Sequence, residues 1–284
     1  MVTKTELKHE FAILITPKKA QQFLDTMGKN RIVSRGQVDK LTAAIERGQW
    51  ILNHDPIIFD WHGCMRNGQH RCKAVIRTDK SIPCDIVWGA NPKAFLTMDV
   101  SIKTRSAADI FSIAGKTNCA LTAAMAKWLW LFQHKAIVPG GRSNAMIALP
   151  THKELLDWAN EQLKTDDSIH IVYNVQNIIH KSVASSLHYL FAKKDKIAAD
   201  KFFICLATGA DMATTNPILI LRNYLIKDAR KAKGRLPATF KAVAIIKAWN
   251  LWRQNKTTIS FKSLSWMRSN GKGKKSEPFP YEIM

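Results

Sequence analysis

The sequence predicts an α+β N-terminal domain followed by a mostly α-helical domain. Up to about residue 115, short apolar runs that suit strands alternate with helical patterns. Beyond that point Leu, Ala, Ile and Trp recur at spacings of three and four, which is typical of packed helices. The 284 residues, 46% of them hydrophobic, are enough for a sizeable core in each part. We expect domains at residues 1–115 and 116–265, followed by a flexible basic tail at residues 266–284.

The first domain opens with an apolar run at residues 9–15, "HEFAILI", which reads as a strand. Thr16 then has the residue type of a helix N-cap, and Pro17 suits the first helical position. A helix should therefore follow and end at Gly28.

The rest of the first domain continues this alternation. Ser34 is expected to cap a second helix that ends at Gly48, and a third helix should begin at Gly68. Three more strands are expected, at residues 56–60, 64–66 and 83–89.

The second domain shows five strong helical patterns. They lie at residues 118–135, 151–163, 196–209, 217–234 and 239–254. Residues 170–179 suit a helix or a strand equally, and residues 257–267 look extended. The Gly- and Lys-rich tail is expected to be loose.

Charge is the strongest compositional signal. The formal net charge is +21 and the isoelectric point is near 9.9. Residues 1–115 contribute +6 and residues 116–284 contribute +15 to this charge. A soluble chain with such an uneven positive charge is expected to bind a polyanion, and we expect nucleic acid, most simply DNA. The alternative is a basic surface that serves solubility alone.

Other classes of protein are disfavoured. The five cysteines stand at positions 64, 72, 84, 119 and 205 without a C-x-x-C pair, so neither a disulfide framework nor a zinc site is expected. The histidines show no metal-ligand spacing such as H-E-x-x-H, and no bound metal is assigned. No apolar run is long enough to span a bilayer and no signal peptide opens the chain. We expect a cytoplasmic protein without a membrane partner, and leave open that it forms a homodimer.

A candidate phosphate site begins with "RNGQHRCKAV", which runs from Arg66 to Val75. A helix N-terminus offers backbone N–H groups and the positive end of the helix dipole. Gly68 allows close approach of a ligand, and His70 and Arg71 add donors suited to phosphate. The alternative is an ordinary helix start whose arginine faces solvent.

Residues 31–115 resemble the ParB/sulfiredoxin superfamily, and most closely the phage-type ParB-like proteins that carry a D-G-Q-H-R signature. "VDKLTAAIERGQWILNHDPIIF" is similar to the segment in which a helix ends at glycine and a Pro-Ile-aliphatic strand follows. "NGQHRCKAV" occupies the position of the family's phosphate-binding box, and "MDVSIKTRSAADIF" is similar to a second family segment. The helical half resembles the C-terminal part of these proteins more loosely.

This resemblance implies an N-terminal ParB/sulfiredoxin-like domain that binds CTP or ATP with Mg²⁺. The candidate nucleotide contacts are Asn67, Gly68, Gln69, His70 and Arg71 in the box and Lys103, Thr104 and Arg105 in the second segment. Gly68 and Gln69 would act through the backbone, and His70 and Arg71 through their side chains. If the site has a catalytic group, the candidates are His70, Asp99 and Asp109. An ordinary loop capped by Ser106 is the alternative for the second segment.

Two positions depart from the family pattern. Gln69 stands where sulfiredoxin has its cysteine and ParB its glutamate, which excludes sulfinic-acid reduction. Asn67 stands where the phage-type proteins have aspartate, and an amide is a poorer base and metal ligand. Both changes argue against hydrolysis even where a nucleotide binds.

A second candidate site is a basic run near the end of the fourth helical pattern of the second domain. Between Arg222 and Arg235 the chain has six basic residues and one acidic residue, Asp228. The candidate nucleic-acid contacts are Arg222, Lys227, Arg230, Lys231, Lys233 and Arg235. A solvated helix face is the alternative.

Three functions remain open from the sequence. The first is a DNA-associated, nucleotide-binding protein whose nucleotide changes its hold on nucleic acid, with or without slow hydrolysis. The second is a metal-dependent nuclease or a DNA-modification component of a phage or mobile element, which would need several of Asp55, Asp60, Asp99 and Asp109 near His70. The third is a non-enzymatic regulator that binds DNA or a protein partner and has a vestigial pocket.

Overall fold

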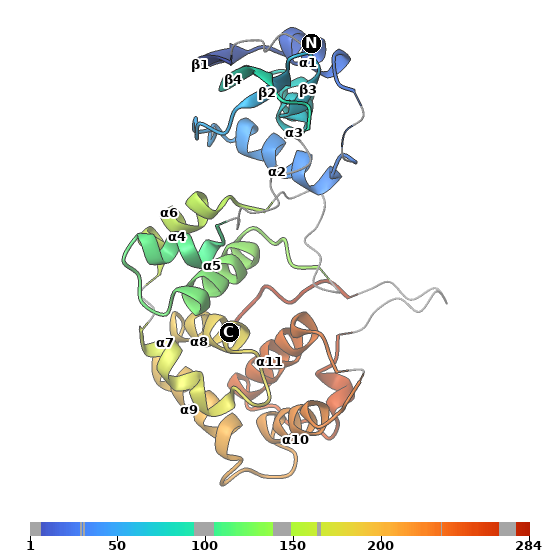
Figure 1. Ribbon diagram of the computed structural model, residues 1–284. Coiled ribbons are helices and arrows are strands. Elements are labelled where there is room, and N and C mark those ends of the chain that lie inside the picture. Colours follow the sequence, from blue (N-terminus) through green and yellow to red (C-terminus); the bar gives the residue numbers. More distant parts are fainter. Residues whose placement is uncertain are drawn as a thin grey trace, which may run out of the picture. The chain divides into compact units, whose positions relative to one another are not determined.

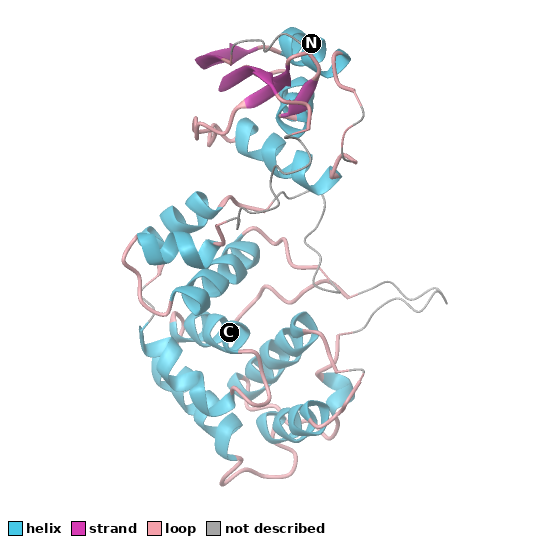
Figure 2. Cartoon of the chain, in the orientation of Figure 1, coloured by secondary structure: helices cyan, strands magenta, loops and turns pink. Residues whose placement is uncertain are grey.

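The structure is a computed structural model that describes residues 7–28, 30, 32–93, 105–138, 149–163, 166–233, 235–266 and 277–284. The chain forms two compact units. Unit 1 comprises Met1–Thr104 and Ala148–Glu154, and unit 2 comprises Arg105–Ile147 and Leu155–Met284. All strands of the described residues lie in unit 1 (Figure 2). The mixed α/β architecture that the sequence predicts is confirmed.

Unit 1 alternates strands and helices in the expected order (Figure 1). Its strands are β1 (Lys8–Ile15), β2 (Ile57–Asp60), β3 (Met65–Asn67) and β4 (Ile82–Ala90), and its helices are α1 (Pro17–Asp25), α2 (Arg35–Glu46) and α3 (Gln69–Thr78). Local signals explain the helix starts. Thr16 Oγ1 accepts the N–H of Lys19 at 3.2 Å, and Ser34 Oγ accepts the N–H of Gln37 at 3.4 Å.

The four strands of unit 1 form one sheet in the order β1-β4-β2-β3. The β1–β4 and β2–β3 pairs are antiparallel, and β2 runs parallel to β4 with Ile57 opposite Ile86. A parallel pair needs a crossover between its strands, and α3 supplies part of that connection. The strand β2 therefore leads through β3 into α3, which places the start of α3 beside the end of the loop before β2.

The core of unit 1 is formed by the sheet and its three helices. Buried residues from all seven elements join one apolar cluster, including Ile57 and Ile86 from the sheet and Phe23, Ile45 and Val75 from the helices. Phe59 stacks on Trp88 with ring centroids 4.0 Å apart. This shared core fixes the starts of α2 and α3 relative to each other.

Unit 2 is helical in its described residues. It contains α4 (Ala107–Ile113), α5 (Cys119–Gln133), α6 (His152–Gln162, which begins in unit 1), α7 (Asp166–Ile171), α8 (Lys181–Ala192), α9 (Lys196–Thr208), α10 (Pro217–Ala229), α11 (Ala238–Arg253) and the 3₁₀ turns η2 (Val172–Val175) and η3 (Phe261–Ser263). Its core centres on Trp249, which is fully buried and stacks on Phe191 with centroids 4.3 Å apart. None of the described helices is long and apolar enough to cross a membrane.

The boundary between the units lies between Thr104 and Arg105 and not after Gly115. The reason is α4, which packs on α5. Its Phe111 is fully buried in a cluster with Ala123 and Trp130, so the helix belongs to unit 2.

Three other expectations for unit 2 need revision. The ambiguous residues 170–179 are helical at their start, where α7 continues into η2. The extended segment expected at residues 257–267 is wrong for its described part, because residues 258–265 form a loop around η3. The sequence also did not single out α8, whose buried face includes Val183, Leu187 and Phe191.

The flexible tail expected at residues 266–284 is wrong for its described ends. Trp266 and Phe279 are buried. The indole N–H of Trp249 donates to the carbonyl of Met284 at 2.7 Å, and the Tyr281 hydroxyl accepts the N–H of Ile137 at 2.9 Å. The last eight residues are therefore part of the fold of unit 2.

Candidate functional site

The predicted phosphate box forms the turn from β3 into α3. Gly68 is the N-cap of α3 with φ +108°, and no side chain caps this helix end. A Cβ at this position would lie 2.9 Å from Cγ1 of Ile57, so glycine is required for both conformation and space. Asn67 supports the turn, because its Oδ1 accepts the N–H of Gly68 at 2.9 Å.

The start of α3 lies beside the start of α2. The N–H of Ser34, the N-cap of α2, donates to Nε2 of His70 at 3.0 Å. Further along, Arg77 pairs with Asp39, and Nζ of Lys80 donates to the carbonyl of Glu46 at 3.1 Å. Contacts that advance together along both helices mean that α2 and α3 run parallel. Their positive dipole ends therefore lie near each other, which suits an anion.

His70 joins these two helix ends. A backbone N–H can only donate, so Nε2 of His70 accepts and carries no proton in this arrangement. The imidazole therefore positions Ser34 through Nε2, and the two helix ends supply positive potential at this place. This role differs from the phosphate contact that the sequence predicts.

Arg71 is buried beside the helix start, where its side chain lies against the loop before β2. Its guanidinium donates to the carbonyls of Asp55 and Pro56, the latter at 2.9 Å, and lies 3.4 Å from a carboxylate oxygen of Asp55. Only 7% of Arg71 is exposed. Arg71 therefore fastens the loop before β2 to α3, and Gln69 beside it is likewise buried.

The carboxylates named for a metal-dependent reaction have other partners. Burial raises the pKa of Asp60, but hydrogen bonds from the N–H groups of Cys64 and His62 and from Arg66 outweigh it, and the pKa lies below its ordinary value. Asp109 accepts the N–H of Ser106 at 2.7 Å in the capping box of α4. Within the described ranges no group of three or more His, Cys, Asp or Glu could hold a metal ion.

The first half of the second predicted segment, with Asp99, Lys103 and Thr104, lies outside the described residues. Arg105 is exposed and opens unit 2, whereas Gly68 belongs to unit 1. The N-cap expected at Ser106 is confirmed.

The basic run is a helix end followed by a loop. The helix α10 ends at Ala229, so Arg222 and Lys227 lie on the helix and the other four basic residues follow it. Arg222 bends away to donate to the carbonyl of Ala207 at 3.3 Å. The exposed cations of the run are Lys227, Arg230, Lys233 and Arg235.

A buried carboxylate organises this loop. Asp228 is fully buried and pairs with Lys231 at 3.2 Å and Lys241 at 3.1 Å, and it also accepts the N–H of Leu236 at 3.1 Å. Burial raises the pKa of Asp228, but these donors outweigh it and the pKa lies below its ordinary value. Asp228 thereby holds the chain on both sides of the exposed cations.

Sequence reasoning missed several residues of these sites. Ser34 was seen only as a cap, although it forms the link to His70. Asp228 was counted as the one acid in a basic run, although it anchors that run. Phe261, which stacks on Tyr224 of α10 with centroids 3.4 Å apart, lies far along the chain and gave no local signal.

Comparison with known proteins finds no matching family model, no similar curated protein and no similar solved structure.

Proposed function

We propose that this chain is a DNA-associated, nucleotide-binding protein of the ParB-like type. The ends of α2 and α3 bind the phosphates of CTP or ATP, and the basic loop after α10 contacts DNA. The bound nucleotide changes the affinity for DNA. The resemblance of "NGQHR" to the family box supports the nucleotide, and the charge of +15 on residues 116–284 supports the nucleic acid.

The observation that carries the nucleotide site is the hydrogen bond between Ser34 and His70. It holds two parallel helix starts side by side, and neighbouring positive helix ends repel each other unless an anion lies between them. A triphosphate supplies that anion. Gly68 and Gly36, two of the residues at these helix ends, present no side chain to a ligand.

Magnesium would accompany the triphosphate. Mg²⁺ is usually held by substrate phosphates together with one or two carboxylates. Asp55 is the exposed carboxylate beside the box: 59% of its side chain is exposed, and its Oδ1 lies 3.5 Å from Nδ2 of Asn67. Its Oδ2 lies 3.4 Å from the guanidinium of Arg71, so the ion would share this carboxylate with Arg71. The function proposed here is nucleotide binding, and two of the acids considered for metal-dependent chemistry, Asp60 and Asp109, are engaged in structural hydrogen bonds.

The DNA contact is supported by the way Asp228 builds the loop. Asp228 pairs with Lys231 within the run and with Lys241 beyond it. Lys227, Arg230 and Lys233 are exposed, so they can follow a phosphate backbone. None of these three has an ion-pair partner among the described residues. Such contacts give affinity with little sequence preference.

Calorimetric titration with CTP and with ATP, each with Mg²⁺, tests the nucleotide site. The matched variants are Gly36→Asp and Gly36→Ala in the first turn of α2, where an added Cβ meets nothing within 4 Å. Aspartate here suits the helix dipole but repels a triphosphate, so it should weaken binding about three- to tenfold without loss of stability. Gly36→Ala should bind as the wild type does.

Two results would overturn this function. No heat from either nucleotide with folded protein removes the nucleotide site. Equal affinity of Gly36→Asp and Gly36→Ala places the nucleotide elsewhere. The coupling to DNA is tested separately, by fluorescence anisotropy of a labelled duplex with and without the nucleotide that binds.

A further inference from the structure

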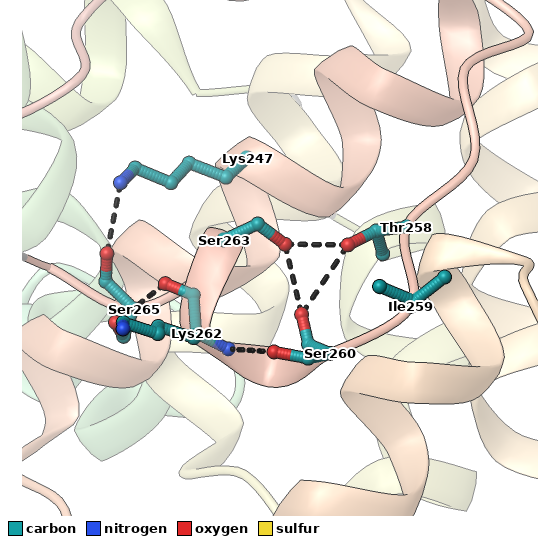
Figure 3. A pocket seen from close by; sticks show the side chains of 7 residues that line it. All are labelled: Lys247, Thr258, Ile259, Ser260, Lys262, Ser263 and Ser265. Atoms are coloured by element: carbon teal, nitrogen blue, oxygen red, sulfur yellow. Dashed lines mark hydrogen bonds between the residues drawn. The ribbon is translucent and has the colours of Figure 1, made fainter.

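Unit 2 contains a surface pocket that no local sequence pattern indicates. Its volume is about 370 Å³, and it is lined by Lys247 of α11 and by residues 258–265 around η3 (Figure 3). The other lining residues are Thr258, Ile259, Ser260, Lys262, Ser263 and Ser265. A single loop thus supplies four hydroxyl groups and one lysine.

Internal hydrogen bonds make the loop rigid. The carbonyl of Ser260 accepts the hydroxyl of Ser263 at 2.8 Å, and Oγ1 of Thr258 lies 2.5 Å from Oγ of Ser263 (Figure 3). The hydroxyl of Ser265 donates to the carbonyl of Lys262 at 2.8 Å. These hydroxyl protons are engaged within the loop, so they shape the pocket and do not serve a ligand.

Two groups of the loop remain able to donate outward. Oγ of Ser260 accepts the N–H of Lys262 at 3.0 Å, and this leaves its own proton for a ligand. Lys262 is exposed and has no ion-pair partner in the part of the chain that is described. Ser260 and Lys262 stand two positions apart in one loop, and a hydroxyl and an ammonium are donors suited to a phosphate oxygen.

Lys247 lines the pocket, and its positive charge is paired with the carboxylate of Glu277. Its Nζ donates to the carbonyl of Ser265 at 2.8 Å and to Oε2 of Glu277 at 2.8 Å, and its side chain is 18% exposed. Glu277 therefore lowers the positive potential of the pocket. Replacing this carboxylate by an amide should raise it.

The loop that lines the pocket packs on α10. Phe261, between Ser260 and Lys262, stacks on Tyr224 of α10, and Nζ of Lys231 lies 5.7 Å from the centre of the Tyr224 ring. The N–H of Thr258 donates to the carbonyl of Thr215 in front of α10 at 2.9 Å. Lys231 thus contacts one ring of this aromatic pair, and Lys262 follows the other ring, Phe261, in the chain.

We propose that the pocket binds a phosphate group through Lys262 and the hydroxyl of Ser260, with Glu277 setting the affinity through Lys247. We assign this phosphate to the backbone of the nucleic acid that the loop after α10 contacts, which rests on the DNA binding proposed above. The pocket would then hold the strand at a point beyond the basic loop.

The test uses the full chain and two probes. Inorganic phosphate is titrated while the backbone amide signals are followed by NMR, and a fluorescein-labelled DNA duplex is titrated by anisotropy at several salt concentrations. The variants are Lys262→Ala, Ser260→Ala and Glu277→Gln, and Lys201→Ala on the exposed face of α9 is the matched control. Thermal unfolding of each variant confirms that it is folded.

We expect phosphate to shift the amide signals of residues 258–265. Lys262→Ala should weaken DNA binding about two- to fivefold, as loss of one exposed ion pair does. It should also lower the salt dependence by about 0.9 in the log–log slope. Ser260→Ala should weaken binding by less, Glu277→Gln should strengthen it, and Lys201→Ala should leave it unchanged.

The failures of the two proposals are distinguishable. Absence of phosphate-dependent shifts in residues 258–265 overturns the pocket, and so does a Lys262→Ala protein that binds DNA as Lys201→Ala does. If phosphate shifts these signals and the wild type binds no DNA, the phosphate pocket stands and the DNA function fails. An increase in phosphate affinity in Glu277→Gln supports the pocket in either case.

Discussion

A Cβ on Gly68 would lie 2.9 Å from Cγ1 of Ile57, so the box that opens α3 is closed against any side chain at this position. Gly68→Ala should lower the free energy of unfolding by about 2–4 kcal/mol, because it adds backbone strain at positive φ to a steric clash. Urea denaturation measures this loss. The melting of α3 should be coupled to that of the sheet, since Ile57 lies in β2.

A double mutant separates the two causes. Ile57→Ala removes the atoms that a new Cβ would meet, and alone it should cost about 2–5 kcal/mol. If the clash matters, Gly68→Ala combined with Ile57→Ala should cost less than the sum of the single variants. Strict additivity would show that backbone strain alone accounts for the loss at Gly68.

Arg71 is predicted to matter for the fold more than for the ligand. Arg71→Ala leaves the carbonyls of Asp55 and Pro56 without their donor and should lower the free energy of unfolding by about 1.5–3 kcal/mol. Arg71→Lys should restore only part of this, because an ammonium cannot reproduce the geometry of the guanidinium. Thermal unfolding measures both. A stable Arg71→Ala protein with lost nucleotide binding would instead mean that the guanidinium turns to the ligand.

Asp228 is the strongest single determinant of the basic loop. Asp228→Ala leaves Lys241, 7% exposed, without its carboxylate and should cost about 3–5 kcal/mol. The double variant Asp228→Leu with Lys241→Met removes both buried charges and should be more stable than Asp228→Ala. DNA affinity should fall in both, since the loop loses its anchor. A stable Asp228→Ala protein would contradict the anchoring role.

The same carboxylate predicts a dependence of stability on pH. Because the pKa of Asp228 is lower in the folded protein than in the unfolded chain, its ionisation stabilises the fold above the ordinary range of an aspartate. This contribution is lost as the pH falls through that range toward the folded pKa. Urea midpoints measured from neutral to acid pH should therefore fall more steeply for the wild type than for Asp228→Asn. Asp60 and Asp200 act in the same direction and remain in both proteins.

The sequence predicted correctly the features that depend on residues close together in the chain, such as the helix N-caps. Thr16, Ser34 and Ser106 cap the helices where they were expected, because a cap depends on residues three or four positions apart. Sequence could not show that His70 meets Ser34, or that Arg71 turns inward to Pro56, because these contacts depend on how α2, α3 and β2 pack in three dimensions. The sequence around Arg71 would be the same whether its guanidinium bound a phosphate or a backbone carbonyl.

Sequence reasoning missed the buried end of the tail and the anchor of the basic run for the same reason. Composition predicts a loose segment from Gly and Lys, but Phe279 and Tyr281 at its end find an apolar surface made by α5 and α11. The single acid in the basic run looked incidental, although burial beside Lys241 makes Asp228 its anchor. The partial burial of Tyr281 and the role of Asp228 both depend on residues that are distant in the chain, which a local sequence pattern does not show.

The thiols provide a test of the core of unit 1. Burial raises the pKa of Cys72 to about 12 and that of Cys84 to about 11, and both side chains are buried in that core. The thiolate is the reactive form, so neither should react with iodoacetamide near neutral pH in the folded protein. Cys64, Cys119 and Cys205 are partly exposed and should react. Mass spectrometry after timed labelling checks this, and urea should release the two protected thiols together with the unfolding of the sheet. Labelling of Cys72 in native protein would show that α3 detaches from the sheet, and with it the helix end on which the proposed nucleotide site depends.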